Sequence, residues 1–440
     1  MVLLKSFRNI FVISELRKKI LFVLSVLIIN RLGTYIPVIG VNVSMLSDLM
    51  QQKSGIGGFL GYFDIFSGGA LTRCTVFALG IQPYITASIF MQILGMTIPS
   101  FEQLMKEGEY GRKIINQYTR YLALGLSVAY SFSYAMLLES KGIVLVPGWG
   151  FRITFVLTLT AGSMLVMWMG DQISLHGIGN GSSVLIFAGI VSEYPAHALR
   201  LMAMVEQGHT HILMALAVLV AYLVITAGIV FLEKGDRKIP VHYARRVVGN
   251  RVYGGQSTYI PFKINSAGIM PVIFASTVIR FPLIIAGMLS SYFPSLETLQ
   301  MVVQSFYNGP LLTVVDFLLV IMFSFFYTAL FVNPAELAEN IRKGGGFVPG
   351  LRPGKQTTDY FNYTLTRVGL VGAIYLATLA ILPTILQNVF HIPFMETGTS
   401  MLIVIGVALE LSNQIESYLI ERRYEGFLRS GRSKSKALRS

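Results

Sequence analysis

The stretch ILMALAVLVAYLVITAGIVFL, residues 212–232, decides the fold class of this chain. It contains 21 residues and not one charged side chain. An α-helix rises about 1.5 Å per residue, so a helix of this length crosses the roughly 30 Å hydrocarbon core of a bilayer. The run therefore predicts a membrane-spanning helix.

The composition of the whole chain agrees with that interpretation. Hydrophobic residues make up 53% of the 440 residues and charged residues only 13%, whereas roughly 25% of an ordinary soluble domain is charged. A chain this apolar has too little polar surface to cover a globule in water. A soluble globular fold is excluded, and we expect an all-α membrane protein that crosses the bilayer repeatedly.

Nine other apolar segments are also long enough to span. The first follows Arg17, Lys18 and Lys19 and lacks a small-residue cleavage site, so we expect a retained span and not a signal peptide. Glu193 and Pro195 shorten the apolar core of the fifth. The ten predicted spans lie near 20–38, 71–96, 118–138, 151–170, 181–199, 212–232, 267–290, 310–332, 367–388 and 398–420.

Basic residues predict the orientation of these spans. Of the 35 lysines and arginines, 28 lie in the two ends and in the loops 2/3, 6/7 and 8/9, and six lie in the opposite loops. Cytoplasmic loops carry the excess of basic residues, so both termini are expected in the cytoplasm. The net charge of +13 suits contact with anionic lipids. A nucleic acid or an acidic protein is the alternative, although no direct DNA binding is expected.

Ten spans divide into two halves of five, predicted at 1–205 and 206–425, with a basic tail at 426–440. An odd number of spans per half gives the halves opposite topology. They would then be related by an axis in the membrane plane.

Residues for catalysis or metal binding are sparse. Cys74 is the single cysteine, which excludes an intramolecular disulfide and a thiolate cluster. The six histidines are scattered, apart from His209 and His211. The chain has no GxSxG motif, HExxH pair or membrane-embedded aspartate pair. We therefore expect no cofactor, no metal and no enzymatic activity.

The segment GGFLGYFDIFSGG, residues 57–69, lies between the first two spans and is apolar, aromatic and glycine-rich. It is too short to cross a bilayer, and irregular backbone at membrane depth is tolerated only inside protein or along a water-filled cavity. It therefore suggests a re-entrant stopper of a pore, with glycines as hinges. An amphipathic surface turn is the alternative.

The second predicted span contains FALGIQPYITASIFMQIL, in which Gly80 and Pro83 interrupt the middle. Ile81 and Ile85 are four residues apart and share a helical face. Thr86, Ser88 and Gln92 are polar; such groups commonly bond to neighbouring helices, and they also suit a helix beside a water-filled path. The glycine-rich DQISLHGIGNGSS, residues 171–183, is explained by a tight turn, because no strand or GK[ST] accompanies it.

Two long polar loops complete the pattern. In the 6/7 loop, alternation between Tyr243 and Tyr259 around Gly254 and Gly255 predicts a projecting hairpin. In the 8/9 loop, GGGFVPGLRPGKQT carries Arg352 between two prolines. Loops of roughly 30 residues exceed what orientation requires, so the segments 233–266 and 333–366 are interpreted as a docking platform.

Motifs along the whole chain resemble the SecY family, the channel subunits of the bacterial Sec translocase. They are FSGGALTR (66–73), FALGIQPYI (77–85), EGEYGRKIINQYTRY (107–121), HGIGNGSS (176–183), RVYGGQSTYIPFKIN (251–265), FFYTALFVNP (325–334) and FVPGLRPG (347–354). The resemblance implies two five-helix halves around an hourglass pore in the bacterial inner membrane. That pore passes unfolded preproteins and releases transmembrane segments sideways into lipid.

The resemblance also implies roles for individual residues. A hydrophobic pore ring would consist of Ile81, Ile85, Ser182, Ile186, Ile273 and Ile403, with serine at a position that is usually aliphatic. A plug would consist of Gly57, Gly58, Phe59, Leu60, Gly61, Tyr62, Phe63, Asp64, Ile65, Phe66 and Ser67.

A lateral gate between spans two, three, seven and eight would include Thr86, Ser88, Gln92, Ser276 and Thr277. Partner docking would fall to Arg245, Arg246, Arg251 and Arg352. The implied partners are SecE, SecG, the SecA motor ATPase, the ribosome, signal sequences and preproteins.

A secondary transporter is the alternative of another class, since it can share inverted repeats and broken helices. It would place ionisable coupling groups at the midplane. Arg31 and Asp316 are the nearest candidates in the sequence.

Overall fold

The computed structural model describes residues 13–46, 64, 66–208, 211–243, 246–248, 251–253, 257–279, 282, 305, 310–390 and 397–437. The chain forms two compact units. Unit 1 combines Met1–Leu199 with Val407–Ser440, and unit 2 covers Arg200–Gly287 and Glu297–Gly406.

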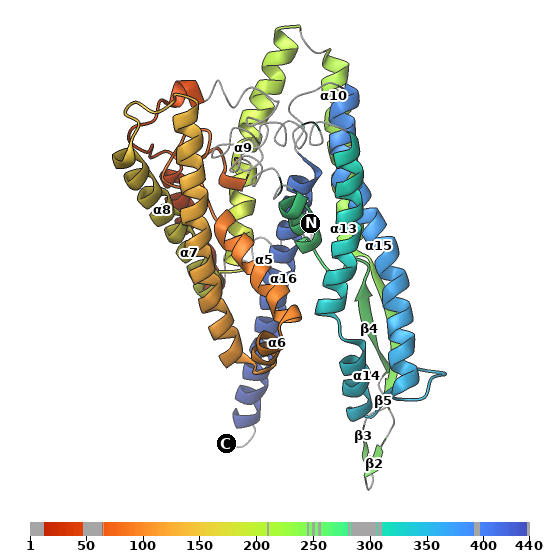
Figure 1. Ribbon diagram of the computed structural model, residues 1–440. Helices are drawn as coiled ribbons and strands as arrows, with labels where there is room; N and C mark the ends of the chain where they lie inside the picture. Colours follow the sequence, from red (N-terminus) through yellow and green to blue (C-terminus); the bar gives the residue numbers. More distant parts are fainter. Residues whose placement is uncertain are drawn as a thin grey trace. The chain divides into compact units, whose positions relative to one another are not determined.

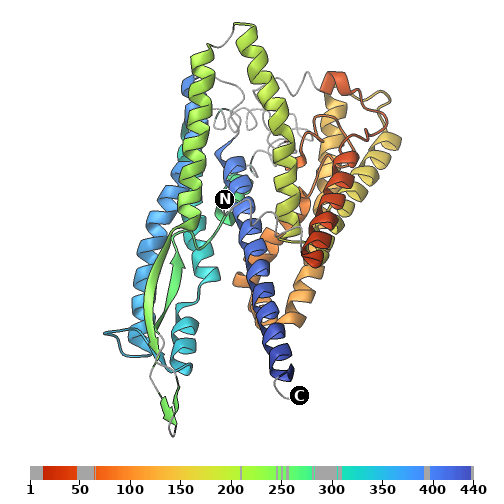
Figure 2. The same cartoon turned by 180° about the vertical axis from the view of Figure 1, so that it is seen from behind.

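Unit 1 is helical. It contains α2 (Ser14–Gly33), α5 (Gln82–Thr97), α6 (Pro99–Lys106), α7 (Glu109–Ser140) and α8 (Trp149–His176), together with most of α9 (Gly181–Glu206) and of α16 (Gly398–Ala437). Figure 2 shows α2 beside α8, and these two helices are in contact. One hydrophobic core of this unit joins Leu71 and Cys74 to Tyr134 of α7 and to Phe155 and Leu159 of α8.

Small residues allow helices of unit 1 to approach closely. A Cβ at Gly162 of α8 would overlap the backbone carbonyl of Val76, and one at Gly181 would overlap the carbonyl of Gly170. Lipid tails are as apolar as leucine, so helices in a membrane associate through such close packing and not through a hydrophobic driving force.

Unit 2 combines long helices with a small sheet. It contains α10 (Ile212–Lys234), the short apolar helix Met270–Ile279, α13 (Pro310–Phe331), α14 (Pro334–Lys343) and α15 (Lys355–Phe390). Figure 1 shows α13 and α15 side by side, with α14 and the strands along the lower part of α15.

The sheet of unit 2 has the order β4-β1-β5. β1 (Asp236–Tyr243) pairs antiparallel with β4 (Ser257–Lys263), from Asp236↔Lys263 to His242↔Ser257, and β5 (Gly346–Phe347) pairs with the end of β1. Ile239, Val241 and Phe262 on its inner face are buried against Phe361 and Leu365 of α15. This packing fixes the strands to the end of a long helix.

A second, two-stranded piece continues the hairpin. β2 (Arg246–Val248) pairs with β3 (Arg251–Tyr253), and Val248 lies opposite Arg251. The projecting hairpin predicted for the 6/7 loop is present, because the paired strands run from Arg246↔Tyr253 to Val248↔Arg251. The predicted turn residues Gly254 and Gly255 lie outside the described residues.

Within the part of the chain that is described, seven helical segments are long and apolar enough to cross a membrane. They are α7, α8, α9, α10, the segment Leu311–Lys343 (which contains α13 and α14), α15 and α16. They coincide with seven of the ten predicted spans. α10 begins at the predicted residue and ends two later, whereas α7, α8, α9, α15 and α16 extend beyond their apolar runs.

The other three predicted spans coincide with shorter or more polar helices. α2 covers residues 20–33 of the first predicted span, ends five residues before its predicted end, starts earlier and includes Arg17, Lys18 and Lys19. Met270–Ile279 is the described part of the seventh.

The second span is shorter than predicted. The segment 71–80 forms turns, and the helix α5 begins only at Gln82. Gly80 has φ of +53° and Pro83 lies in the first turn of α5; a left-handed residue cannot continue a right-handed helix, and proline suits a helix start.

Candidate functional site

The base of the predicted plug is a compact turn organised by Asp64. Its Oδ1 accepts hydrogen bonds from the backbone N–H groups of Leu71 at 2.9 Å and Thr72 at 3.0 Å. Its other oxygen accepts the Thr72 hydroxyl, and the Ser67 hydroxyl donates to the Asp64 carbonyl at 3.0 Å. The carboxylate therefore ties the end of the plug to the turn that leads into α5. Of the plug residues, Asp64, Phe66 and Ser67 are described. Gly57, Gly58, Phe59, Leu60, Gly61, Tyr62, Phe63 and Ile65 lie outside the described residues.

Two glycines, Gly68 and Gly69, follow the predicted plug at the position of its predicted hinge. Gly68 has φ of +65° and Gly69 has φ of +81°, in the left-handed region that glycine adopts without steric cost. Gly68 lies against Gly189 of α9: a Cβ there would stand 3.1 Å from the Gly189 Cα. The end of the plug is thus seated on α9.

Arg31 contacts this hinge, a role that the sequence did not reveal. It lies in the last turn of α2, and its Nη1 donates to the carbonyl oxygen of Gly68 at 2.6 Å. Its Nη2 lies 3.8 Å from Oε1 of Glu193 on α9. Arg31 was considered as a coupling residue of a transporter, but here it has protein partners beside the plug.

Ile81 and the plug base line one small cavity. Its volume of about 20 Å³ is large enough for about one water molecule. Among its lining residues are Phe66 and Ser67 of the plug, Ile81 of the predicted ring, and Leu185 and Gly189 of α9. Ile81 is 3% exposed.

Two of the predicted ring positions of unit 1, Ile81 and Ser182, lie beside Gly170 of α8. A Cβ at Gly170 would lie 3.3 Å from Cδ1 of Ile81 and 3.6 Å from the backbone nitrogen of Ser182. Ile186, one turn after Ser182, is buried, and Ile85 is half-buried. Ile273 and Ile403 belong to unit 2, where Ile403 is buried and Ile273 half-buried.

The glycine-rich segment 176–183 is a capped turn, as the sequence indicates. Oδ1 of Asn180 accepts the backbone N–H groups of Ser182 at 3.1 Å and Ser183 at 3.4 Å. Asn180 thereby caps the start of α9. Gly179, with φ of +85°, turns the chain before it.

Polar side chains at the predicted gate positions bond largely to their own helices. The Thr86 hydroxyl donates to the Gln82 carbonyl at 3.1 Å, and Nε2 of Gln92 donates to the Ser88 hydroxyl at 3.4 Å. In unit 2 the hydroxyls of Ser276 and Thr277 both donate to the Ile273 carbonyl, at 2.9 and 2.8 Å.

Among the docking candidates, Arg352 is the best defined. It is exposed in a turn between Gly350 and Gly354, both with positive φ. Its backbone N–H donates to Gln356 Oε1 at 3.3 Å and its carbonyl accepts the Thr357 hydroxyl at 3.0 Å. Both backbone polar groups of Arg352 are therefore hydrogen bonded, which stabilises the turn. Arg246 and Arg251 lie in β2 and β3, and Arg245 lies outside the described residues.

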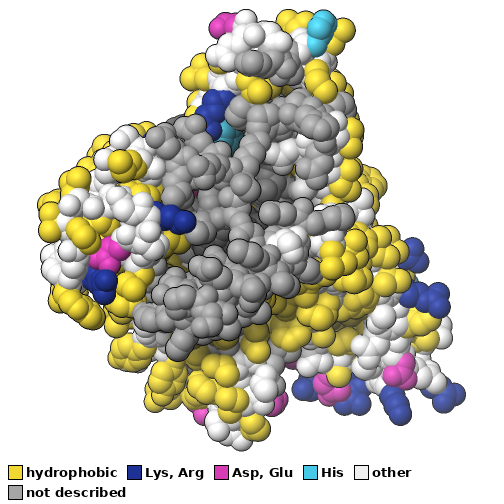
Figure 3. All heavy atoms as spheres, turned by 45° about the horizontal axis from the view of Figure 1, so that its top comes forward, with side chains coloured by type: hydrophobic (Ala, Val, Ile, Leu, Met, Phe, Trp, Pro, Cys, Tyr) yellow, Lys and Arg dark blue, Asp and Glu magenta, His cyan; other side chains and the backbone are white. Residues whose placement is uncertain are grey.

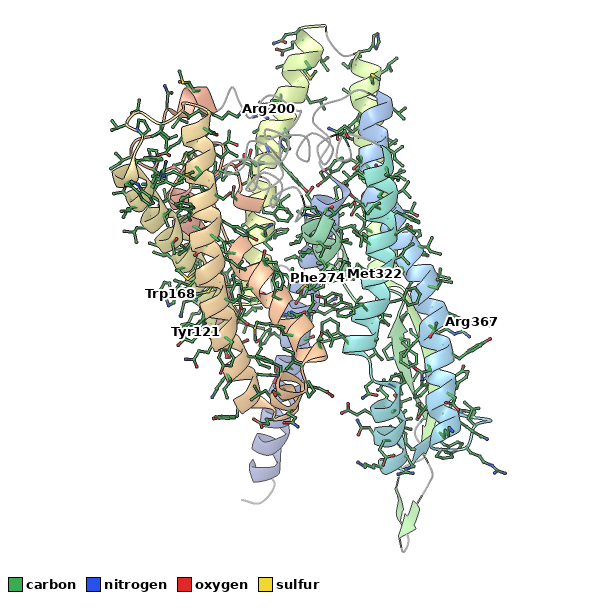
Figure 4. The ribbon with its side chains drawn as sticks, viewed as in Figure 1. Tyr121, Trp168, Arg200, Phe274, Met322 and Arg367 are labelled. Carbon is green, nitrogen blue, oxygen red and sulfur yellow. The ribbon has the colours of Figure 1, made fainter. Side chains whose placement is uncertain are left out.

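The outer surface is apolar where helices would face lipid. Figure 3 shows hydrophobic side chains over much of the described surface, with lysines and arginines gathered toward the lower right. In Figure 4, Trp168 and Tyr121 lie on the outer side of α8 and α7; they are 58% and 62% exposed. In the described part of the chain, no group of three or more His, Cys, Asp or Glu side chains could hold a metal ion.

These features define a polytopic α-helical membrane protein with polar loops at one end of unit 2. The SecY family model matches residues 75–412. Protein translocase subunit SecY of Escherichia coli (strain K12) is 41% identical over 428 residues, which cover 96% of each chain. That of Thermus thermophilus is 42% identical over 439 residues, 98% of this chain and 99% of the relative. The chain belongs to the SecY family.

Solved structures share the fold. One described as the structure of a protein-conducting channel has a TM-score of 0.63 at 16% identity and covers 91% of this chain and 92% of its own. A SecY structure reported for a plug domain that stabilises the closed channel has a TM-score of 0.63 at 17% identity, with the same coverage. Sec61 from a canine ribosome–channel complex has a TM-score of 0.59 at 15% identity, again with that coverage. Together with the relatives, they make this chain the protein-conducting channel subunit of a translocase and not an enzyme.

Proposed function

We propose that Ile81, Ile85, Ser182, Ile186, Ile273 and Ile403 form the constriction through which unfolded preproteins pass, and that residues 57–67 close it in the idle state. The observation that carries this proposal is the shared cavity: plug residues Phe66 and Ser67 line the same small space as Ile81. A plug that ends there is placed to block a path that runs past Ile81.

The chemistry of the ring suits this role. Branched apolar side chains around a narrow passage disfavour a continuous column of water, so ions cross poorly. They also make no hydrogen bonds that would hold particular residues of a passing chain. Ser182 is the polar exception; its backbone is fixed by the Asn180 cap.

A transmembrane segment leaves such a channel sideways. We assign the gate to spans two, three, seven and eight, with Thr86, Ser88, Gln92, Ser276 and Thr277 along it. A segment would be selected by its own hydrophobicity, because lipid competes with the pore for it.

Partners would bind the loops of unit 2. Arg352 is exposed on a held turn, and Arg246 and Arg251 lie in the strands of the projecting hairpin. Sec61, which shares the fold, is found in a ribosome–channel complex, and we assign these loops to the ribosome and to the SecA motor. SecE and SecG would complete the complex in the bacterial inner membrane, with anionic lipids around it and both termini in the cytoplasm.

Site-specific photocrosslinking tests the proposal. A photoreactive side chain at 81, 273 or 403 is expected to capture a preprotein stalled during export. Trp168 is the control position, because it is 58% exposed on the outer side of α8. Equal capture at 168 and at the three ring positions, or none at the ring, would refute the proposed path.

A further inference from the structure

The Gly68–Gly69 hinge is held by two helices of unit 1 at once. From α2, Arg31 donates to the Gly68 carbonyl at 2.6 Å. From α9, Gly189 lies against Gly68, and Oε1 of Glu193 stands 2.7 Å from where a Cβ on Gly69 would be. The hinge is therefore enclosed between a cation and an anion from different helices.

The opposite charges of Arg31 and Glu193 stabilise each other electrostatically. Arg31 and Glu193 lie 3.8 Å apart, and their side chains are only 32% and 19% exposed. A guanidinium that is partly removed from water requires a compensating anion, and its bond to a carbonyl is then stronger than a neutral bond. Nη2 of Arg31 also donates to the Tyr35 hydroxyl at 3.4 Å, which further restricts the orientation of the arginine side chain.

Glu193 also shares a helix face with a ring residue. Ile186 and Glu193 are both on α9 and seven residues apart, which is nearly two full turns. A movement of α9 that carries Ile186 outward therefore carries Glu193 with it. Such a movement takes the carboxylate away from Arg31 and from Gly69.

We infer that Arg31 and Glu193 form a latch that holds the Gly68–Gly69 hinge in its closed conformation and that opens when α9 moves. The inference rests on the proposed role of residues 57–67 as the plug. It makes Arg31 and Glu193 positioning residues for gating: they contact the hinge and not the passing chain. Widening of the ring and release of the plug become one event, because α9 takes part in both.

The test measures ion conductance of the idle complex, purified from membranes and reconstituted in planar bilayers without preprotein. Arg31→Gln removes the charge-assisted bond, and we expect the fraction of time the pore conducts to rise about tenfold. Glu193→Gln keeps the shape beside Gly69 and should give a smaller rise of the same sign. The double variant should match Arg31→Gln and not exceed it, because one latch is removed either way.

The matched control is Arg152→Gln. Arg152 pairs with Glu139 at 2.6 Å in the same unit but away from the hinge, so this variant should conduct like the wild type. If the complex with Arg31→Gln does not assemble, Arg31→Lys and Glu193→Gln are used to test the latch. Lysine keeps the positive charge of arginine but lacks the planar fork of N–H donors of its guanidinium. Wild-type conductance in these variants overturns the latch.

The failure of the latch can be separated from the failure of the plug. If deletion of 57–67 raises conductance while the Arg31 and Glu193 variants do not, the plug stands and the latch is wrong. If the deletion itself leaves conductance unchanged, the plug and the latch are both wrong.

Discussion

Nδ2 of Asn265 donates to Oε1 of Glu233 at 2.6 Å and to the carbonyl oxygen of Gly268 at 3.0 Å. Glu233 lies in the last turn of α10, where the chain leaves for β1, and Asn265 follows β4, where the chain returns. The N–H of Ile264 also donates to the Gly235 carbonyl at 3.0 Å. These bonds close the base of the β1–β4 hairpin.

Asn265→Ala should loosen that base. A hydrogen bond to a charged group contributes about 1.5–3 kcal/mol, and its loss also leaves a half-buried carboxylate without this donor. We expect limited proteolysis to cut the 6/7 loop roughly tenfold faster, because cleavage follows local opening. Ser266→Ala is the control, since its exposed hydroxyl only donates to the Lys263 carbonyl. Equal cleavage rates for both variants would contradict the expectation.

Gly162→Ala should destabilise unit 1. A Cβ there would overlap the Val76 carbonyl, a backbone atom that cannot rotate away, and overpacking typically costs about 1–3 kcal/mol. We expect a lower melting temperature of the purified complex. A Cβ at Gly125 of α7 would meet nothing within 4 Å. Gly125→Ala should therefore be neutral or stabilise by up to about 1 kcal/mol; a melting temperature that falls as far in this variant would refute the explanation.

Deletion of residues 57–67 should raise ion leakage through the idle pore, because the proposed ring alone then keeps ions out. Single-channel recording in planar bilayers measures this directly. A deletion that ends before Gly68 keeps Gly68 and its bond to Arg31, although it removes the Asp64 carbonyl that accepts the Gly69 N–H. Unchanged conductance would remove the plug assignment.

Arg352→Glu should impair motor-driven export by about tenfold or more, because a reversed charge repels the acidic surface that arginine would bind. Membrane insertion of the channel should be normal. Arg342→Glu makes the same charge change in the same loop, but Arg342 pairs with Glu339 on α14, so export should fall much less. Normal export with Arg352→Glu, or equal loss in both variants, would count against the docking role.

Seven of the ten predicted spans coincide with described helices that are long and apolar enough to cross a membrane, because apolar length alone identifies a membrane helix. The sequence predicted 212–232 to within two residues, since charges follow the apolar run there. It missed that α15 starts twelve residues before its apolar run, because a helix does not stop where the bilayer stops. It also placed a span over 71–81, where the residues are apolar but form turns around Gly80. Hydropathy does not distinguish a buried turn from a helix.

The candidate site was predicted in part. The glycines of residues 57–69 were predicted to be hinges, and that role stays a prediction; Gly68 and Gly69 have positive φ values. From the sequence, Arg31 was considered only as a coupling group of a transporter, and Glu193 only as a residue that shortens the apolar core of the fifth span. Their contacts join positions far apart in sequence, and no local pattern reports such a contact.

The helix α15 has 36 residues, so it is about 54 Å long, whereas the hydrocarbon core is about 30 Å thick. Its N-terminal end packs against the sheet through Phe361 and Phe262, whose ring centroids are 5.4 Å apart. The only proline within it, Pro383, lies near the opposite end. A force applied to that sheet by a bound partner would therefore be transmitted into the bilayer along one continuous helix, α15.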